Sequence, residues 1–285
     1  MEPKATLIVK PKPPYTITHH LKLFTIPGEP APCICEDYCC RRLLGLLAFE
    51  ACVSGEPENP VVRIRVYEGD PREAEQAVKH IYNTNLDYQD FLEKAKHVPK
   101  LHALALRARG ARPALVPSLF EAIVKSIIQQ QIPQRLALKI TSKLIRAFGP
   151  HQTISGKTFY DFPSPSTLAQ LSVEELRGVG LSARKAEYIL DLSRRAERVY
   201  DIERIMRKDP ETAASMLLEF RGVGSWTAKL SIMAATGQLV FSLIEDKSVA
   251  RGLKRIGLTG EELSIVEERL REYIGLVMYL ASLHH

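Results

Sequence analysis

The sequence predicts an α+β N-terminal domain followed by an all-α domain, and three observations support this fold class. Residues 1–112 contain segments in which apolar and polar residues alternate, as they do in strands with one buried face. From Ser118 onward strand signals nearly vanish and helix-start signals become frequent. Between the two parts, the segment 108–117, "ARGARPALVP", has the glycine, prolines and small residues of a linker. We therefore expect two domains, residues 1–112 and residues 113–285.

The N-terminal domain should contain both strands and helices. Strands are expected at 6–10 (TLIVK), 15–26 (YTITHHLKLFTI) and 60–69 (PVVRIRVYEG). Helices are expected at 38–52 and 71–83. These elements predict an antiparallel sheet with helices, and the fold of the TATA-binding protein is one such arrangement.

All five cysteines lie in this domain, between Cys33 and Cys52, and four of them fall in "CICEDYCC". Thiolates from one short loop can converge on zinc or iron. However, the Cys33-x-Cys35 and Cys39-Cys40 spacings lack the paired C-x2-C knuckles of structural zinc sites. Buried free cysteines at the start of the expected helix 38–52 are the favoured alternative. Disulfides are a third option, one that occurs inside cells mainly in hyperthermophiles.

Composition and charge limit the class of protein. The chain has 285 residues, 45% of them apolar, and no run of eighteen apolar residues that could cross a membrane. Its start lacks the basic, apolar and small-residue order of a signal peptide. We therefore expect a soluble intracellular protein, cytoplasmic and associated with the nucleoid if the source is a prokaryote. The net charge of +6 suits a polyanionic partner without proving one.

Helix-start signals divide the second domain into roughly eight short helices. Three capping boxes are expected, namely Ser118-x-x-Glu121, Ser172-x-x-Glu175 and Thr259-x-x-Glu262. Asp209 followed by Pro210 is a further start, with the acid as N-cap and the proline at the first helical position. The longest break between helices should be the loop 149–166, "GPHQTISGKTFYDFPSPS".

Two glycines, one residue apart, interrupt a helical region in "EFRGVGSWTAKLS", residues 219–231. Gly222 and Gly224 permit backbone angles that a Cβ would forbid, Val223 can pin the turn, and Ser225 can cap the next helix. The exposed N–H groups beside a helix N-terminus suit a phosphate. A plain connection between two helices is the alternative. The similar stretch "RGVGLSARKAEYI", residues 177–189, predicts a second unit of this kind.

A carboxylate followed by a basic helix is the second notable pattern, in "FSLIEDKSVARGLKRIG", residues 241–257. Asp246 follows an apolar, strand-like run and precedes a helix whose exposed side carries Lys247 and Arg251 one turn apart, with Lys254 and Arg255 beyond. A solvated helix face with Asp246 as a plain N-cap explains the pattern equally well. A carboxylate beside cations that meet DNA is also suited to catalysis.

Together these residues resemble a known family. "FRGVGSWTA", followed twenty positions after Trp226 by Asp246 in D-x-x-V-x-R, resembles the helix-hairpin-helix/GPD superfamily of DNA base-excision glycosylases. The chain is most similar to the 3-methyladenine DNA glycosylase II, or AlkA-like, group. The likeness extends over most of 118–285 and includes "FEAIVKSIIQQQIPQRLALKITSKLIRAFG". In the N-terminal domain it is faint and limited to "EDYCCRRLLGLLAFEACVSG".

The resemblance implies hydrolysis of the N-glycosidic bond of a damaged, chiefly alkylated, base that is flipped out of duplex DNA. Asp246 is then the catalytic carboxylate, which stabilises an oxocarbenium-like transition state and activates water. Relatives that also cut the strand carry a lysine where this chain has Trp226. Lys229 lies three residues further and need not face the same pocket. The resemblance therefore implies a monofunctional enzyme without lyase activity.

The resemblance also assigns the remaining contacts. Trp226, Leu230 and Leu276 are expected to line the base pocket, although core packing is an alternative for Trp226. Gln131, flanked by Gln130 and Ile132, falls where the group inserts a side chain into DNA, and an ordinary polar loop is the alternative. The expected DNA contacts are Gln130, Gln131, Ile132, Gly222, Val223, Gly224, Ser225, Lys247 and Arg251.

We expect double-stranded DNA with damaged bases as the partner, a monomeric state and no required cofactor. A monovalent cation on the backbone carbonyls of Phe220, Gly222 and Val223 is implied by the resemblance. An iron-sulfur cluster of the endonuclease III kind is not expected, because no cysteine follows Cys52. A glycosylase for oxidised or deaminated bases and a non-catalytic DNA-binding protein remain the alternatives, and Asp246 separates the enzymes from the latter.

Overall fold

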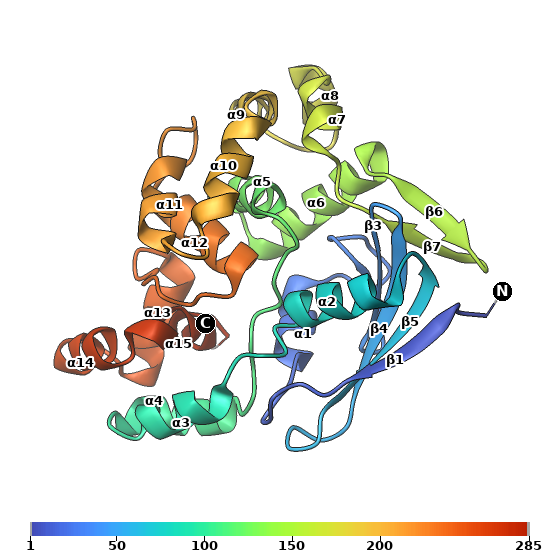
Figure 1. The fold of residues 1–285 in the computed structure, drawn as a ribbon. Helices are drawn as coiled ribbons and strands as arrows, with labels where there is room; N and C mark the ends of the chain where they lie inside the picture. The colour runs from blue at the N-terminus through green and yellow to red at the C-terminus, as the bar shows by residue number, and fades with distance from the viewer. Residues whose placement is uncertain (1, 284–285) are drawn as a thin grey trace.

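The computed structural model describes residues 2–283 and shows an antiparallel sheet with helices followed by a mainly helical domain (Figure 1), which confirms the predicted fold class. The strands are β1 (Ala5–Val9), β2 (Ile34–Glu36), β3 (Cys39–Leu44), β4 (Leu47–Ser54), β5 (Val61–Glu68), β6 (His151–Ile154) and β7 (Lys157–Tyr160). The first helices are α1 (Thr18–Phe24), α2 (Pro71–Ile81), α3 (Tyr88–Ala95) and α4 (Pro99–Arg107). They are followed by α5 (Leu119–Gln129), α6 (Gln134–Phe148), α7 (Pro165–Ala169), α8 (Val173–Gly178), α9 (Ala183–Arg194), α10 (Ala196–Ile205), α11 (Pro210–Leu217), α12 (Ser225–Thr236), α13 (Lys247–Ile256), α14 (Glu261–Arg269), the 3-10 turn η1 (Arg271–Tyr273) and α15 (Ile274–Ser282).

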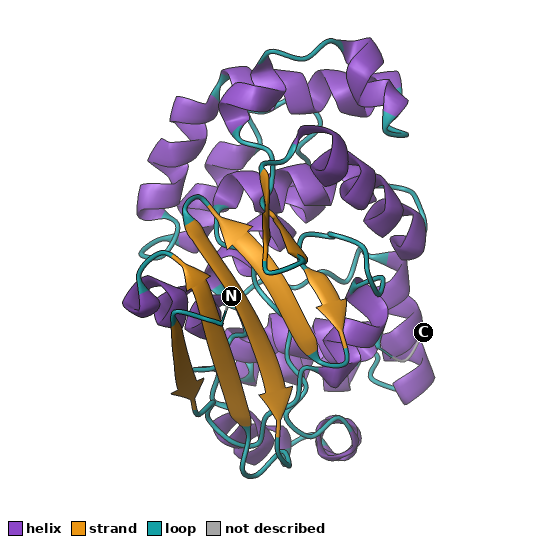
Figure 2. Cartoon of the chain, turned by 90° about the vertical axis from the view of Figure 1, so that its right-hand side faces the viewer, coloured by secondary structure: helices purple, strands orange, loops and turns teal. Residues whose placement is uncertain are grey.

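The N-terminal sheet has the strand order β1-β5-β4-β3-β2, and every neighbouring pair is antiparallel. Val62, Ile64 and Val66 of β5 are all fully buried, because α2 packs over their face of the sheet. Arg63 and Arg65 alternate with them and point to the opposite face, which is turned towards the viewer in Figure 2. The predicted strands at 6–10 and 60–69 and the helix at 71–83 are therefore confirmed.

Two predicted elements of this domain are wrong. Residues 38–52 form the hairpin of β3 and β4 instead of a helix, with Gly45 in the left-handed region at φ 57°. Their near-continuous apolar run suits β4, because it is a central strand between β3 and β5 and is largely buried. Residues 15–26 contain helix α1 instead of a strand, and α1 packs against α6. This tertiary contact outweighs the strand propensity of the segment.

The predicted linker around Arg112 is a fixed part of the interior. Arg112 is 0% exposed, and its guanidinium donates hydrogen bonds to the carbonyl oxygens of Lys12, Pro14, Asn83, Leu86 and Gly110. Helices α3 and α4 also belong to the core cluster of the helical part, through Phe91 and Leu101 among others. By packing, the two units therefore divide before Tyr88 rather than after Arg112.

The predicted helix starts are mostly right. Ser172 and Glu175 form the complete capping box, and Asp209 accepts a hydrogen bond from the N–H of Thr212. Ser118 caps α5, but the Glu121 side chain turns away to pair with buried Arg42 of β3. The box at Thr259 is wrong, because α14 begins after Gly260 and Glu262 pairs with Lys100 of α4.

The expected long loop 149–166 contains the two-stranded hairpin of β6 and β7, so the helical domain is not purely α. Strand β7 packs beside β3, and Lys157 donates hydrogen bonds to Glu50 of β4 at 2.8 and 3.0 Å. This hairpin helps to join the sheet to the helical domain.

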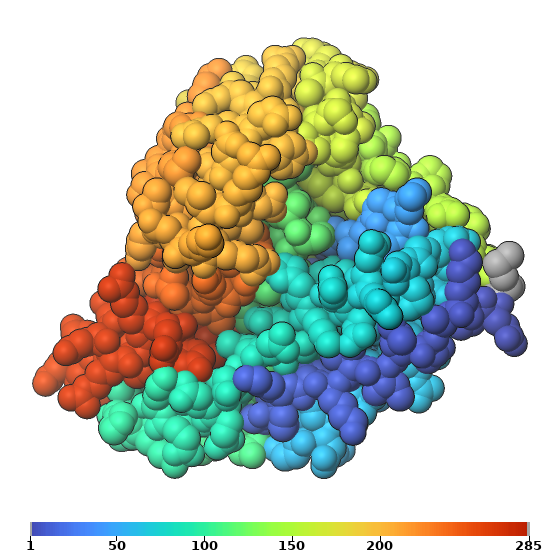
Figure 3. All heavy atoms as spheres, in the orientation of Figure 1, coloured from blue at the N-terminus to red at the C-terminus, as the bar shows by residue number. Residues whose placement is uncertain are grey.

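The C-terminal helices close the helical core. Helix α15 packs on α13 and on α4, and Figure 3 shows these last helices lying directly against the α3–α4 segment. Gly252 of α13 makes this close contact possible, because a Cβ there would lie 2.0 Å from the carbonyl oxygen of Ala281. Within residues 2–283, every helix is too short or too polar to cross a membrane.

Candidate active site and nucleic-acid interface

The glycine hairpin forms between α11 and α12 as expected. Val223 is buried and pins the turn, whereas Gly224 and Ser225 are exposed. Gly222 lies in the left-handed region at φ 80°, where a side chain would be strained. The predicted cap is wrong: Gly224 occupies the N-cap position, Ser225 is the first helical residue, and no side chain caps α12. The first N–H groups of α12 therefore have no capping side chain, as an anion site at a helix N-terminus requires.

The two glycines serve different purposes. A Cβ on Gly222 would lie 2.0 Å from Cδ2 of Tyr188, so this glycine allows the hairpin to pack on α9. A Cβ on Gly224 would meet nothing within 4 Å. Only Gly224 therefore leaves the backbone open to a large ligand.

The repeat "RGVGLSARKAEYI" forms a second hairpin beside the first. Ser182 caps α9 by accepting a hydrogen bond from the N–H of Lys185 at 3.3 Å. A groove of about 420 Å³ lies between the two hairpins and residues 130–133, which connect α5 to α6 and are called the glutamine loop. Its lining residues are Gln130, Gln131, Ser182, Arg184, Lys185, Tyr188, Gly222, Val223 and Gly224. Sequence reasoning did not assign Arg184, Lys185 and Tyr188 to the interface, although the repeat itself was the signal for them.

The glutamine loop separates inward and outward side chains. Gln130 points inward, where its Nε2 donates hydrogen bonds to the carbonyl oxygen of Gly222 at 2.8 Å and to Oγ1 of Thr227 at 2.9 Å. Gln131 is exposed and lies in the left-handed region at φ 56°, a conformation that is uncommon outside glycine. Ile132 packs against the helical core. Gln131 is thus the most exposed of these three side chains.

Lysine 185 fixes the same loop from the other side. The Nζ of Lys185 donates hydrogen bonds to the carbonyl oxygens of Ile128 and Gln130, both at 2.7 Å. These oxygens are at the C-terminal end of α5, where a cation is favourable. The glutamine loop is consequently tied to both hairpins, to one through Gln130 and to the other through Lys185.

The carboxylate of Asp246 is bound at both oxygens. Its Oδ1 accepts hydrogen bonds from the Ser248 N–H at 2.7 Å, the Ser248 hydroxyl at 2.5 Å and the Val249 N–H at 3.3 Å. Its Oδ2 accepts one from the indole Nε1–H of Trp226 at 3.0 Å. Asp246 is therefore an N-cap through one oxygen and joins α12 to α13 through the other. The expected strand-like run before it is irregular in the structure.

Lys229 reaches the loop that carries Glu245 and Asp246, and the expectation that it need not face the same pocket as Trp226 stays a prediction. Its Nζ lies 3.6 Å from Oε1 of Glu245, the residue next to Asp246. Residues three apart on a helix are neighbours on one face. Lys229 is thus held in an ion pair at the edge of the site, one helical turn from Trp226.

The remaining predicted contacts occupy distinct surroundings. Trp226 and Leu230 are partly buried on α12, whereas Leu276 of α15 is fully buried in the helical core. Lys247 and Arg251 are exposed on α13. The basic face of α13 is therefore solvent-accessible next to Asp246.

Two backbone carbonyl oxygens of the hairpin accept hydrogen bonds within the protein. The oxygen of Phe220 accepts the N–H of Val223 at 3.1 Å, and the oxygen of Gly222 accepts the Gln130 amide. Each carbonyl oxygen has a second lone pair, so one hydrogen bond does not prevent it from binding a cation. A monovalent cation here stays a prediction.

The helical domain thus combines two helical hairpins, a carboxylate at a helix start and a basic helix. The family model described as "HhH-GPD superfamily base excision DNA repair protein" matches residues 124–275. The chain belongs to this superfamily.

Named proteins resemble the chain over different lengths. The DNA-3-methyladenine glycosylase of Bacillus subtilis (strain 168) is 31% identical over 163 residues, covering 56% of this chain and 54% of the relative. That match thus spans about half the length of the relative. A "Probable N-glycosylase/DNA lyase" of Methanothermobacter thermautotrophicus is 26% identical, covering 84% of this chain and 83% of its own. The solved 3-methyladenine DNA glycosylase of Archaeoglobus fulgidus has a TM-score of 0.81 and 29% identity, covering 96% of this chain and 97% of its own.

Proposed function

We propose that the protein is a monofunctional DNA glycosylase that removes alkylated bases, 3-methyladenine among them, from double-stranded DNA. The observation that carries the proposal is the Asp246 carboxylate, held between Trp226 and the start of α13 within a matched superfamily domain. The named glycosylases of Bacillus subtilis and Archaeoglobus fulgidus support the choice of substrate.

In the proposed complex, the protein binds the phosphate backbone of the DNA. The open N-terminus of α12 at Gly224 binds one phosphate, and Arg184 in the groove and Arg251 on α13 bind others. Such contacts position the duplex without reading its sequence. Gln131 then enters the space that the flipped nucleotide leaves, where its amide can hydrogen-bond to the orphaned base.

The proposed chemistry depends on charge. Cleavage of the N-glycosidic bond leaves positive charge on the sugar, and the Asp246 carboxylate stabilises it and orients the attacking water. Four hydrogen bonds fix the direction of the carboxylate before the substrate arrives. An alkylated purine already carries positive charge, so its departure needs little acid catalysis. The faces of Trp226 and Leu230 provide an apolar and aromatic surface that suits a cationic base.

Trp226 supports hydrolysis without strand cleavage, because lyases of this fold carry an amine at its position. Lys229 is the nearest amine on the same helix face, and it is ion-paired with Glu245. An ammonium is not a nucleophile until it loses its proton. Borohydride should therefore trap no covalent protein–DNA adduct. An adduct that disappears in Lys229→Gln would show that Lys229 is a lyase nucleophile and that the monofunctional proposal is wrong.

The whole proposal is tested by a mass-spectrometric screen of free bases released from duplex DNA that carries alkylated, oxidised and deaminated bases. We expect 3-methyladenine and related alkylated purines among the products. If only oxidised or deaminated bases were released, the protein would be a glycosylase of the same fold that acts on a different class of damaged base. Tight binding to damaged DNA without release of any base would leave only a DNA-binding role.

A further inference from the structure

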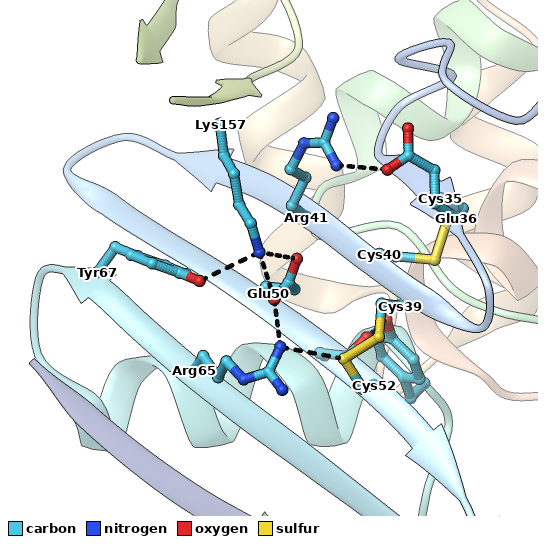
Figure 4. The surroundings of a disulfide bond; sticks show 12 residues. Cys35, Glu36, Cys39, Cys40, Arg41, Glu50, Cys52, Arg65, Tyr67 and Lys157 are labelled. Atoms are coloured by element: carbon cyan, nitrogen blue, oxygen red, sulfur yellow. Dashed lines mark hydrogen bonds and ion pairs between the residues drawn. A yellow bond between two sulfur atoms is a disulfide. The ribbon is translucent and has the colours of Figure 1, made fainter. Parts of the chain in front are cut away.

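Three cysteine sulfur atoms lie close together at the edge of the N-terminal sheet that is formed by β2. Cys35 of β2 and Cys40 of β3 are direct partners in the register of the two strands and form one disulfide. Cys39 and Cys52 form a second disulfide between β3 and β4, and Figure 4 shows both bonds. Because Cys39 and Cys40 are consecutive in a strand, they point to opposite faces of the sheet.

Among the residues that the structure describes, Cys33 is the one free cysteine, and it lies beside the first disulfide. Its Sγ is 3.3 Å from Sγ of Cys35, and the sulfurs of Cys33, Cys35 and Cys40 all lie within 4.8 Å of one another. Ligand sulfurs at about 2.3 Å from a tetrahedral ion are roughly 3.8 Å apart, so small side-chain shifts would bring the three around one ion. These sulfur atoms belong neither to the proposed active site nor to the proposed DNA contacts.

Burial raises the pKa of the Cys33 thiol and disfavours an isolated thiolate, whereas nearby cations can offset the negative charge of a metal–thiolate group. Cys35 and Cys40 are 5% and 4% exposed, whereas Cys33 is partly exposed. Arg42, Lys125 and Glu121 are all close enough to interact electrostatically with Cys33. They carry two positive charges and one negative charge, which leaves one positive charge in excess. Three thiolates carry one net negative charge with Zn²⁺ and two with Cu⁺, so the one excess positive charge would offset the former fully and the latter in part.

We propose that Cys33, Cys35 and Cys40 form a binding site for a thiophilic cation, Zn²⁺ or Cu⁺, which opens when the Cys35–Cys40 disulfide is reduced. A dithiol reductant breaks the disulfide by donating two electrons and two protons, and is itself oxidised to a disulfide. The three thiols then release three protons and their sulfurs bind the cation. Three thiolates complete the trigonal coordination of Cu⁺, and Zn²⁺ takes a solvent ligand on the side of Cys33.

The test is an anaerobic metal titration of the full chain after reduction by a phosphine. Co²⁺ serves as the spectroscopic probe of the Zn²⁺ arm, and Cu⁺ supplied from a chelator is the second arm. We expect one equivalent to bind with thiolate-to-metal charge-transfer absorption, and Cys33→Ser to weaken binding by at least about tenfold. The matched control, Cys39→Ser with Cys52→Ser, removes the disulfide on the other face and should bind as the wild type does.

Alkylation of the reduced wild type gives an independent readout that needs no variant. Bound Zn²⁺ or Cu⁺ should protect Cys33, Cys35 and Cys40 from iodoacetamide, while Cys39 and Cys52 are alkylated. The proposal is overturned if metal protects none of the three or if binding follows Cys39 and Cys52. It is equally overturned if circular dichroism shows that the reduced chain no longer folds, because the site would then not exist in the native protein.

Discussion

The indole Nε1–H of Trp226 donates a hydrogen bond of 3.0 Å to Oδ2 of Asp246. Helix α12 supplies the donor and the first residue before α13 supplies the acceptor, so the bond joins the hairpin helix to the basic helix. The same tryptophan also offers its ring to the proposed base pocket. Trp226 can therefore position the carboxylate and contact the base at once.

Replacing Trp226 with phenylalanine removes the N–H donor and keeps an aromatic ring. A hydrogen bond to a charged group contributes about 1.5 to 3 kcal/mol, so single-turnover base release should slow by roughly 10-fold to 100-fold. DNA affinity should change little, because the contact lies away from the phosphates. If base release by Trp226→Phe equals that of the wild type, Trp226 does not orient Asp246.

The two hairpin glycines should respond differently to alanine. Gly222→Ala places a Cβ 2.0 Å from Tyr188 at a left-handed position, so we expect a loss of about 2 to 4 kcal/mol in the free energy of unfolding. In Gly224→Ala the new Cβ meets no atom within 4 Å, so the free energy of unfolding should be nearly unchanged. The same Cβ would occupy the space proposed for a phosphate, so affinity for any DNA sequence should fall about tenfold. Denaturant unfolding and fluorescence anisotropy check the pair. Wild-type affinity in Gly224→Ala would reduce the hairpin to a structural connection.

Arg112 should be essential to stability. Arg112→Ala would remove a donor from five backbone carbonyl oxygens, of which those of Gly110 and Asn83 keep a backbone N–H partner. This loss should cost about 3 to 5 kcal/mol in denaturant unfolding. Arg109 is the matched control, because it is exposed and pairs with exposed Glu58. Arg109→Ala should stay within about 0.5 kcal/mol of the wild type. Similar losses in both variants would contradict the role assigned to Arg112.

Acid should destabilise the fold partly through His20. Burial, and to a smaller extent the neighbouring Lys125, lowers the pKa of His20 from its ordinary value of 6.5 to about 3. Below pH 6.5, His20 therefore binds a proton in the unfolded state but stays neutral in the folded state. The stability that the neutral His20 contributes is complete above pH 6.5 and is lost as the pH falls towards 3. The free energy of unfolding should drop by about 1 to 2 kcal/mol more in the wild type than in His20→Gln between about pH 7 and about pH 5. Equal pH dependence in the two proteins would contradict this.

Local sequence signals predicted the features that local chemistry determines. The hairpin at Gly222, the starts at Ser172 and Asp209, and the strand 60–69 all rest on capping residues or on alternation within a few positions. The carboxylate at Asp246 was likewise visible as the last residue before a basic helix.

Features that depend on distant contacts were not predictable. The hairpin 38–52 is a strand pair because β4 is central in its sheet, and Arg112 is buried because the chain's first residues wrap around it. Gln130 could not be recognised as an inward-facing residue, because its partners Gly222 and Thr227 lie far along the chain. Ser248, which donates twice to Asp246, carried only the weak signal of a residue after an N-cap.

The most direct test of the account compares wild type with Asp246→Asn in base release and in DNA binding on one duplex with a single alkylated purine. Asparagine keeps the size and the N-cap position but removes the negative charge. We predict that release falls by at least about 100-fold while affinity for the duplex is kept or improved, because the charge acts only in the transition state. Release at the wild-type rate by Asp246→Asn would contradict the assignment of Asp246 as the catalytic carboxylate.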